Sequence, residues 1–352
     1  MRVAVTSRTT KTRSPVSTPR TLIAKPARVY PIGINHNFTS WTSLTEINND
    51  YIPRLLEAGV KYARYEFVMA DQQPTEGVFS YTGADYNNRV NALRAAGFEI
   101  IALLDQYGMP AWAKTSGDGM AHPTPAVYKA WCQNVATYFK GRIRFYEMGN
   151  EPNYTFFWPT GVNAVEYTDL MKAGYEGIKL GDPNAKVIAG AFGSVGTTSG
   201  NGVATHEFLE TMLQNGAANY YDYLSPHTYA QPVSNANFQT VLDNIDQWRG
   251  VQTSYGDYKP WIVTEHGWTT YTGGVSEANQ AANITSYFNE IMTGERKFIR
   301  IICYHNFRES SDAGEPEHNY GLVNNDYSRK PAFQSFIDAK NTFKSTFREL
   351  IP

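Results

Sequence analysis

Eight short apolar runs recur along the chain at intervals of about 40 residues, and a longer stretch of helical periodicity follows each one. Strands that alternate with helices in this way predict a parallel sheet with crossover helices, an α/β fold. The predicted strands are 30–35, 62–67, 99–104, 143–148, 186–191, 223–227, 261–264 and 299–304. The predicted helices are 48–58, 84–96, 124–140, 163–180, 205–215, 236–250, 276–293 and 331–343.

Eight strand–helix units of this size are what a closed (β/α)8 barrel requires. An open doubly wound sheet is the alternative, and it normally has a glycine-rich first turn. The first predicted strand instead runs into Gly33-Ile-Asn-His-Asn37, which contains no GxGxxG. Because we find no second core and no internal linker, we expect a single (β/α)8 TIM barrel over residues 29–352.

Charge is distributed unevenly along the chain. Residues 1–30 hold seven of the 31 Lys and Arg residues, and the first carboxylate is Glu46. The remaining 24 basic and 33 acidic residues give the barrel a net charge of −9, which argues against a nucleic-acid partner. Residues 1–28 also contain Pro, Ser and Thr, so we expect a disordered basic tail or linker there; an anchor for polyanions or membrane surfaces is the alternative.

The chain carries few signals of targeting or crosslinking. No run approaches 18 apolar residues, so no transmembrane segment is expected. The basic N-terminus is not followed by an apolar region, so no signal peptide can be read. Two cysteines, Cys132 and Cys303, are too few for a disulfide framework, and neither lies in a CxxC pair. No cofactor is implied.

Polar residues follow almost every predicted strand, at the end of the barrel where active sites form. Two carboxylates are of special interest: Glu151 follows the fourth strand and Glu265 follows the seventh. These strands lie across the barrel mouth from each other, so the two side chains can converge on one bond. Paired carboxylates are typical of glycoside hydrolysis, in which one protonates the leaving oxygen and the other attacks the sugar or activates water.

The segments around these carboxylates resemble clan A glycoside hydrolases, a large retaining superfamily built on (β/α)8 barrels. Tyr146-Glu-Met-Gly-Asn-Glu-Pro-Asn153 resembles the acid/base motif, and Trp261-Ile-Val-Thr-Glu-His-Gly-Trp268 resembles the nucleophile strand. Two further matches support this, the second of them family 39-like: Pro74-Thr-Glu-Gly-Val-Phe-Ser-Tyr81 with Asp85, and His318-Asn-Tyr-Gly-Leu-Val323 with Lys330-Pro-Ala-Phe333. The resemblance covers about residues 31–343.

The resemblance implies a role for each matched residue. Glu151 would be the general acid/base and Glu265 the nucleophile. Arg64 would support the nucleophile, and Asn150 would bind the sugar 2-hydroxyl. His227 and Tyr229 match a His-x-Tyr after the sixth strand, whose tyrosine is expected to hydrogen-bond the nucleophile. Held in this way, Glu265 should keep a low pKa and should raise the pKa of Glu151. We expect Glu147 to pair with Arg64 or a neighbour inside the barrel.

The sequence also departs from the clan pattern. Many members have Trp immediately before Asn-Glu-Pro, where this chain has Gly149. The eighth strand usually ends in a Trp that forms the floor of the sugar subsite, so Tyr304 or His305 would take that role here. Aromatic loop residues can pack over the barrel or stack on sugars. We expect Trp112 and Trp268 to be subsite walls, and the Tyr154–Trp158 cluster is an equally balanced candidate.

Histidines at strand ends raise a metal-dependent hydrolase as a rival. Such barrels typically have a His-x-His pair on the first strand, and Asn35-His36-Asn37 lacks it. We therefore expect no metal, and we interpret His36 with His227 and His305 as candidate sugar-contacting residues. The overall prediction is a retaining glycoside hydrolase acting on a poly- or oligosaccharide, with endo action favoured. A transglycosylase and a non-catalytic carbohydrate-binding barrel are the alternatives. The resemblance suggests an extracellular or periplasmic location.

Overall fold

The structure, a computed structural model, describes residues 32–35, 42–82, 85–116, 121–230, 237–293, 296–310 and 314–347. The predicted tail over residues 1–28 and the candidate sugar-binding residue His36 lie outside these ranges. No helix within them is both long and apolar enough to cross a membrane.

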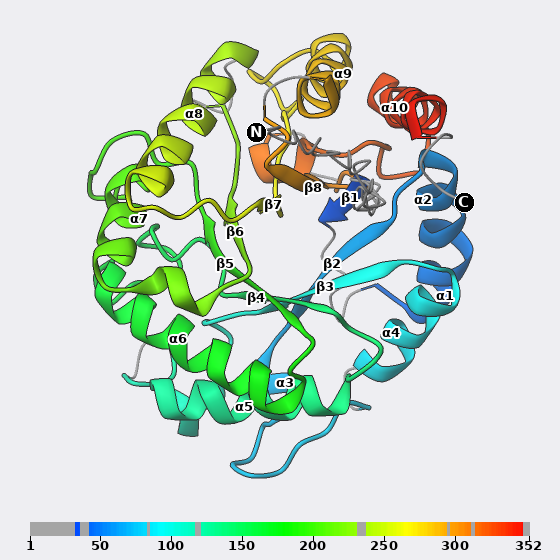
Figure 1. The fold of residues 1–352 in the computed structure, drawn as a ribbon. Helices are drawn as coiled ribbons and strands as arrows, with labels where there is room; N and C mark the ends of the chain where they lie inside the picture. Colours follow the sequence, from blue (N-terminus) through cyan, green and yellow to red (C-terminus); the bar gives the residue numbers. More distant parts are fainter. Residues whose placement is uncertain are drawn as a thin grey trace, which may run out of the picture.

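Eight parallel strands close into a barrel in the order of the sequence (Figure 1). The first strand pairs with the second and, closing the barrel, with the eighth. Asn35 of the first strand thus lies opposite Arg64 on one side and His305 on the other. The predicted (β/α)8 barrel is therefore confirmed. The strands are β1 (Ile32–Asn35), β2 (Tyr62–Phe67), β3 (Glu99–Leu104), β4 (Phe145–Met148), β5 (Lys186–Phe192), β6 (Tyr223–Pro226), β7 (Trp261–Val263) and β8 (Ile299–His305).

Helices form a ring around the strands, and each predicted helix has a counterpart (Figure 1). The α-helices are α1 (Leu44–Glu46), α2 (Ile52–Ala58), α3 (Met69–Gln72), α4 (Tyr86–Ala95), α5 (Pro125–Tyr138), α6 (Ala164–Gly181), α7 (Thr205–Gln214), α8 (Phe238–Ser254), α9 (Glu277–Thr293) and α10 (Pro331–Phe347). A short π-helix, η1 (Ile47–Tyr51), joins α1 to α2. Short 3-10 turns are η2 (Ala111–Ala113), η3 (Ala217–Tyr220) and η4 (Pro316–Asn319).

The barrel interior is apolar at its N-terminal end and polar at its C-terminal end. An apolar plug fills the lower part, built from Tyr62, Ile101, Phe145, Ile188, Ile262, Ile301 and Cys303. Side chains two residues apart on a strand face the same side, so Arg64 and Glu147 lie one layer above Tyr62 and Phe145. The plug therefore supports a layer of buried polar side chains, and the site is built on that layer.

Glycines allow α5 and α6 to approach closely on the outside of the barrel. A Cβ atom at Gly177 would lie 2.3 Å from the carbonyl oxygen of Lys129, and one at Gly181 would lie 2.5 Å from that of Gln133. At Gly174 it would lie 2.6 Å from Sδ of Met148, on β4. The close packing of α5 and α6 thus depends on the absence of side chains along one face of α6.

Substitution Gly177→Ala is expected to destabilise the protein by about 1–3 kcal/mol, because the added methyl group overlaps a backbone oxygen that cannot move freely. The matched control is Gly250→Ala in α8, where an added Cβ meets nothing within 4 Å. There, the helix propensity of alanine should raise stability by about 0.5–1 kcal/mol. Chemical denaturation measures both changes, and equal stability of the two variants would contradict the packing argument.

Candidate active site

A cavity of about 450 Å³ opens at the C-terminal ends of the strands. Carboxylates outnumber cations in its wall, and several aromatic rings form its sides. The lining residues are Asn35, Arg64, Glu66, Leu103, Asp105, Tyr107, Asn150, Glu151, Tyr154, Phe156, Phe157, Tyr229, Glu265, His305, Glu317 and Tyr320. The structure therefore brings together Glu151, Glu265, Arg64, Asn150, Tyr229 and His305 of the predicted site.

Glu265, which follows β7, is held as an anion. Arg64 Nη1 donates to its Oε1 at 2.5 Å, and the Tyr229 hydroxyl donates to its Oε2 at 2.9 Å. Burial on its own would raise the pKa of this carboxyl, but electrostatic interactions with His227, Arg64 and His305 and the hydrogen bond from Tyr229 lower it to about 2. The expected low pKa of Glu265 therefore follows from its contacts.

Arg64 of β2 joins the residues on the barrel floor. Its Nε donates to Glu147 Oε2 at 2.6 Å, and its Nη2 donates to Asn150 Oδ1 at 2.7 Å. Nη1 also donates to Asn35 Oδ1 at 3.2 Å. Glu147 is completely buried, and its expected pairing with Arg64 is confirmed. The guanidinium is thus fixed between two carboxylates and orients the Asn150 side chain at the cavity wall.

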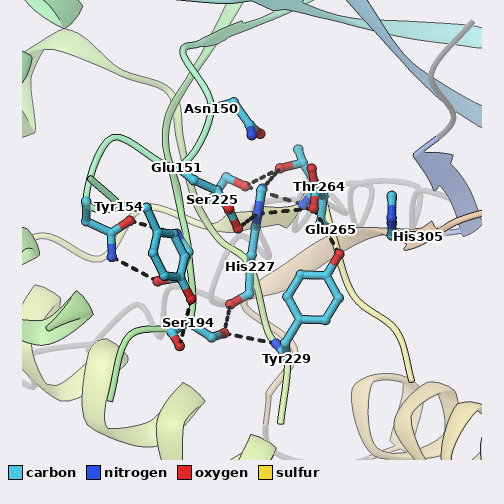
Figure 2. Close-up of polar contacts among 12 residues, drawn as sticks. Asn150, Glu151, Tyr154, Ser194, Ser225, His227, Tyr229, Thr264, Glu265 and His305 are labelled. Carbon is cyan, nitrogen blue, oxygen red and sulfur yellow. Dashed lines mark hydrogen bonds and ion pairs between the residues drawn. The ribbon is translucent and has the colours of Figure 1, made fainter. Parts of the chain in front are cut away.

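Glu151 lies on the other side of the cavity, where the chain leaves β4. Its Oε1 lies 2.8 Å from Nδ1 of His227, which is itself fully buried (Figure 2). Burial raises the pKa of Glu151; the hydrogen bond with His227 opposes this, while the negative charges of Glu265 and Glu317 add to it. The net effect is a raised pKa for Glu151. The pKa values of Glu151 and Glu265 are therefore shifted in opposite directions, as the roles of acid and nucleophile require.

The backbone around Glu151 has an unusual conformation that only certain residues allow. Gly149 has φ +79°, and a Cβ there would lie 2.6 Å from Gln106 Oε1. Glu151 itself has φ +42°, a conformation that is strained for a residue with a side chain. Gln106 accepts from the Asn150 N–H and donates to the Asn150 carbonyl, both at 2.7 Å. Glycine at the position where clan members often have Trp is therefore required by this turn.

The two carboxyl groups are close to each other. One oxygen of Glu151, one of Glu265 and a ring nitrogen of His227 all lie within 4.8 Å of one another. Among the described residues these side chains have the spacing of a possible metal site. However, the Arg64 guanidinium already pairs with Glu265 Oε1, and this fixed positive charge beside the carboxylate opposes the binding of a cation. The arrangement therefore suits proton transfer and nucleophilic attack better than metal binding.

Three of the predicted aromatic side chains do not reach the cavity. Tyr304 points away from the barrel axis because it alternates with Cys303 and His305, and its ring packs on Phe336 of α10. Trp268 is buried edge-on against His266 and Tyr287. Trp112, half-buried in η2, donates from Nε1 to the carbonyl oxygen of Gln73. The predictions that Trp268 forms a wall of the sugar site and that Tyr304 can form its floor are therefore corrected, and His305 takes the position at the end of β8. Trp112 is not among the residues that line the cavity, and its role as a subsite wall stays a prediction.

Other aromatic residues line the cavity instead. Tyr154, Phe156 and Phe157 of the Tyr154–Trp158 cluster contribute to its wall, whereas Trp158 is buried and stacks on His122. Tyr107 packs on Phe157 with ring centroids 5.4 Å apart, and its hydroxyl donates to Glu66 at 2.8 Å.

Sequence reasoning assigned no individual role to Glu66, Asp105, Glu317 and Tyr320, which line the cavity, or to Gln106, which anchors Asn150. Glu317 Oε1 lies 2.8 Å from His305 Nε2. Although burial lowers the pKa of His305, Glu317 and Glu265 raise it above the ordinary value. Glu317 directly precedes the His318-Asn-Tyr-Gly motif and Tyr320 is part of it, so the motif was a usable signal for this loop.

No protein-family model matches the chain, and no curated protein matches its sequence. Solved structures do match it. A family 39 glycoside hydrolase from the gut symbiont Bacteroides cellulosilyticus WH2 has 22% identity and a TM-score of 0.69 over 90% of this chain, which spans 64% of that protein. A monomeric beta-xylosidase from Caulobacter crescentus CB15 has 19% identity and a TM-score of 0.65 over 88% of this chain and 69% of its own.

A GH5_18 protein from Streptomyces cattleya, solved in complex with GlcNAc, has 14% identity and a TM-score of 0.71 over 93% of this chain and 82% of its own. At these identities the similarity concerns the fold. The chain has the (β/α)8 barrel fold of family 39 and family 5 clan A glycoside hydrolases.

Proposed function

We propose that this protein is a retaining glycosidase that hydrolyses O-glycosidic bonds of an oligo- or polysaccharide by double displacement. The observation that carries the proposal is the spacing of Glu151 and Glu265, whose nearest oxygens lie within 4.8 Å. Carboxyl groups about 5 Å apart are typical of retaining enzymes, whereas inverting enzymes need about 6.5–9.5 Å to admit a water molecule. The fold shared with known glycoside hydrolases supports the same conclusion.

The contacts of each carboxyl suit one role. Glu265, ionised and held by Arg64 and Tyr229, attacks the anomeric carbon. Glu151, with its raised pKa, donates a proton to the leaving oxygen. The glycosyl–Glu265 ester is then hydrolysed by water that Glu151, now ionised, deprotonates. Asn150, fixed by Arg64 and Gln106, is placed to donate to a sugar hydroxyl from its side-chain amide.

The cavity extends beyond the carboxyl pair, which supports a substrate of more than one sugar ring. Phe156 is 68% exposed at the rim, and its ring packs edge-on against Phe157, with centroids 4.9 Å apart. Aromatic faces of this kind cover the apolar faces of sugars while hydroxyl groups stay free to hydrogen-bond. The acidic wall, with Glu66, Asp105 and Glu317, disfavours uronic acids and favours neutral sugars.

Substitution Glu265→Gln should reduce turnover by about a thousandfold or more, because the amide cannot form the glycosyl ester. The wild-type protein should release its product with the anomeric configuration of the substrate, as read by proton NMR in the first minutes of reaction. Glu176→Gln, on the exposed side of α6, is the matched control and should keep full activity. Persistent turnover in Glu265→Gln, or an inverted first product, would refute the mechanism.

The pH profile of kcat/KM should be bell-shaped with a broad acidic side. Glu265 must be ionised, so activity is lost only as the pH falls toward its pKa of about 2. Glu151 must be protonated, so activity is lost as the pH rises through its raised pKa. Circular dichroism at each pH separates titration from unfolding. In Glu151→Gln the loss of kcat/KM at high pH should disappear. If this alkaline limb of the profile remains unchanged, a residue other than Glu151 is the general acid.

Substitution Phe156→Ala should lower kcat/KM by about three- to tenfold on oligosaccharides, because one stacking surface is lost. Aryl glycosides of a single sugar should be hydrolysed at the wild-type rate, since they need not reach the rim. Tyr258→Ala removes an equally exposed ring remote from the cavity (71%) and serves as the control. If both substrates lose activity equally, Phe156 does not contact a second ring.

A further inference from the structure

Below the cavity, four buried side chains connect Glu151 to the barrel floor. His227 and Ser225 of the β6 region, Thr264 at the end of β7 and Glu147 of β4 are all fully buried. Thr264 Oγ1 lies 2.5 Å from Glu147 Oε1, 2.6 Å from Ser225 Oγ and 3.2 Å from His227 Nε2 (Figure 2). Thr264 thus contacts all three of the others.

The hydrogen atoms in this cluster can be assigned from valence alone. A hydroxyl group has one hydrogen to donate and two lone pairs to accept with. Glu147 pairs with Arg64 through its Oε2, so its Oε1 is an acceptor and the Thr264 hydrogen points to it. Thr264 Oγ1 must therefore accept from its two other neighbours. Ser225 Oγ accepts from the Thr264 backbone N–H at 3.3 Å, and its own hydrogen is then available to donate to Thr264 Oγ1.

The same assignment determines the tautomer of His227. Since Thr264 has no hydrogen left for it, His227 Nε2 must carry a hydrogen and donate to Thr264 Oγ1. Nδ1 then faces Glu151 Oε1 at 2.8 Å and Glu265 Oε2 at 3.4 Å. A lone pair and a carboxylate oxygen repel each other at 2.8 Å, so one proton must lie between Nδ1 and Glu151. The phenol ring of Tyr229 also lies near the imidazole, with ring centroids 6.3 Å apart.

We propose that Glu147, acting through Thr264, is a positioning residue that holds His227 in the Nε2–H tautomer and so keeps the acid proton on the Glu151–His227 pair. The inference rests on the proposed glycosidase activity. It extends that proposal because the buried Glu147 then serves both catalytic carboxyls. Its Oε2 orients Arg64 beneath Glu265, and its Oε1 orients Thr264 beneath His227 and Glu151.

Breaking the hydrogen-bonded path from Glu147 through Thr264 to His227 should change only the step in which Glu151 protonates the leaving group. In Thr264→Val, Nε2–H loses its acceptor, and His227 can adopt the Nδ1–H tautomer, which donates to ionised Glu151 and stabilises it. The alkaline limb of kcat/KM on a glycoside with a poor leaving group should then move down by about one pH unit. A dinitrophenyl glycoside needs no protonation of its leaving group, and its kcat/KM should stay within about twofold of wild type.

Two matched variants separate the link from general damage. Thr264→Ser keeps the hydroxyl and should restore the wild-type pH profile. Ser225→Ala removes another hydroxyl from the same buried cluster but leaves the path from Glu147 to His227 intact, so its profile should also stay unchanged. Equal losses on both substrates in Thr264→Val, or an unmoved alkaline limb, would overturn the proposal.

A second readout does not depend on turnover. In protein labelled with 15N-histidine, the His227 signals are those that disappear in His227→Gln. Nε2 should be protonated in the wild type, in Thr264→Ser and in Ser225→Ala, whereas Thr264→Val should show protonated Nδ1 and unprotonated Nε2. Unprotonated Nε2 in the wild type would overturn the inference. Absence of wild-type hydrolysis would instead overturn the proposed function, because the tautomer would still be measurable.

Discussion

The pairing of the Arg64 guanidinium with Glu147 and Glu265 is the interaction on which the rest of the site depends. A buried carboxylate is strongly destabilising unless a positive charge and hydrogen bonds compensate for the water it has lost. Two carboxylates and one guanidinium share such compensation here, and Asn35 and Asn150 satisfy further donors of Arg64. The arrangement lets the protein keep Glu265 ionised next to Glu151, a second carboxyl whose pKa is raised.

The barrel supports this charge cluster by dividing its interior into two zones. Below Arg64, an apolar plug with Phe145 and Ile262 excludes water from the floor. Above it, the strands end, and the cavity opens to solvent. Because side chains alternate along each strand, a register shift of one residue would turn both the polar layer and the apolar plug from the barrel interior to its outer face. The chemistry of the site and the stability of the barrel therefore depend on the same strand register.

Much of the architecture could be predicted from the sequence because it has local causes. Strand and helix positions follow from apolar periodicity, and Glu151 and Glu265 follow from being polar residues at strand ends within recognisable motifs. The aromatic walls could be predicted only in part, since their placement depends on loop folding: Tyr154, Phe156 and Phe157 of the candidate cluster line the cavity, whereas Trp268 does not. The sequence left Tyr304 and His305 as alternatives at the end of the eighth strand; neighbouring side chains on a strand point to opposite faces, so only His305 faces the cavity. Gln106 could not be predicted either, because its side chain bonds the backbone of Asn150, and the identity of a residue does not show which backbone groups it will contact.

The turn at Gly149 couples two loops of the barrel. Because a side chain at position 149 would collide with Gln106, the loop after β3 and the loop after β4 must fit each other. Replacing either loop alone by one with a side chain at position 149 would displace the amide that anchors Asn150. A redesign of the cavity must therefore exchange both loops together, or be confined to the rim around Phe156 and to the segment that carries Glu317.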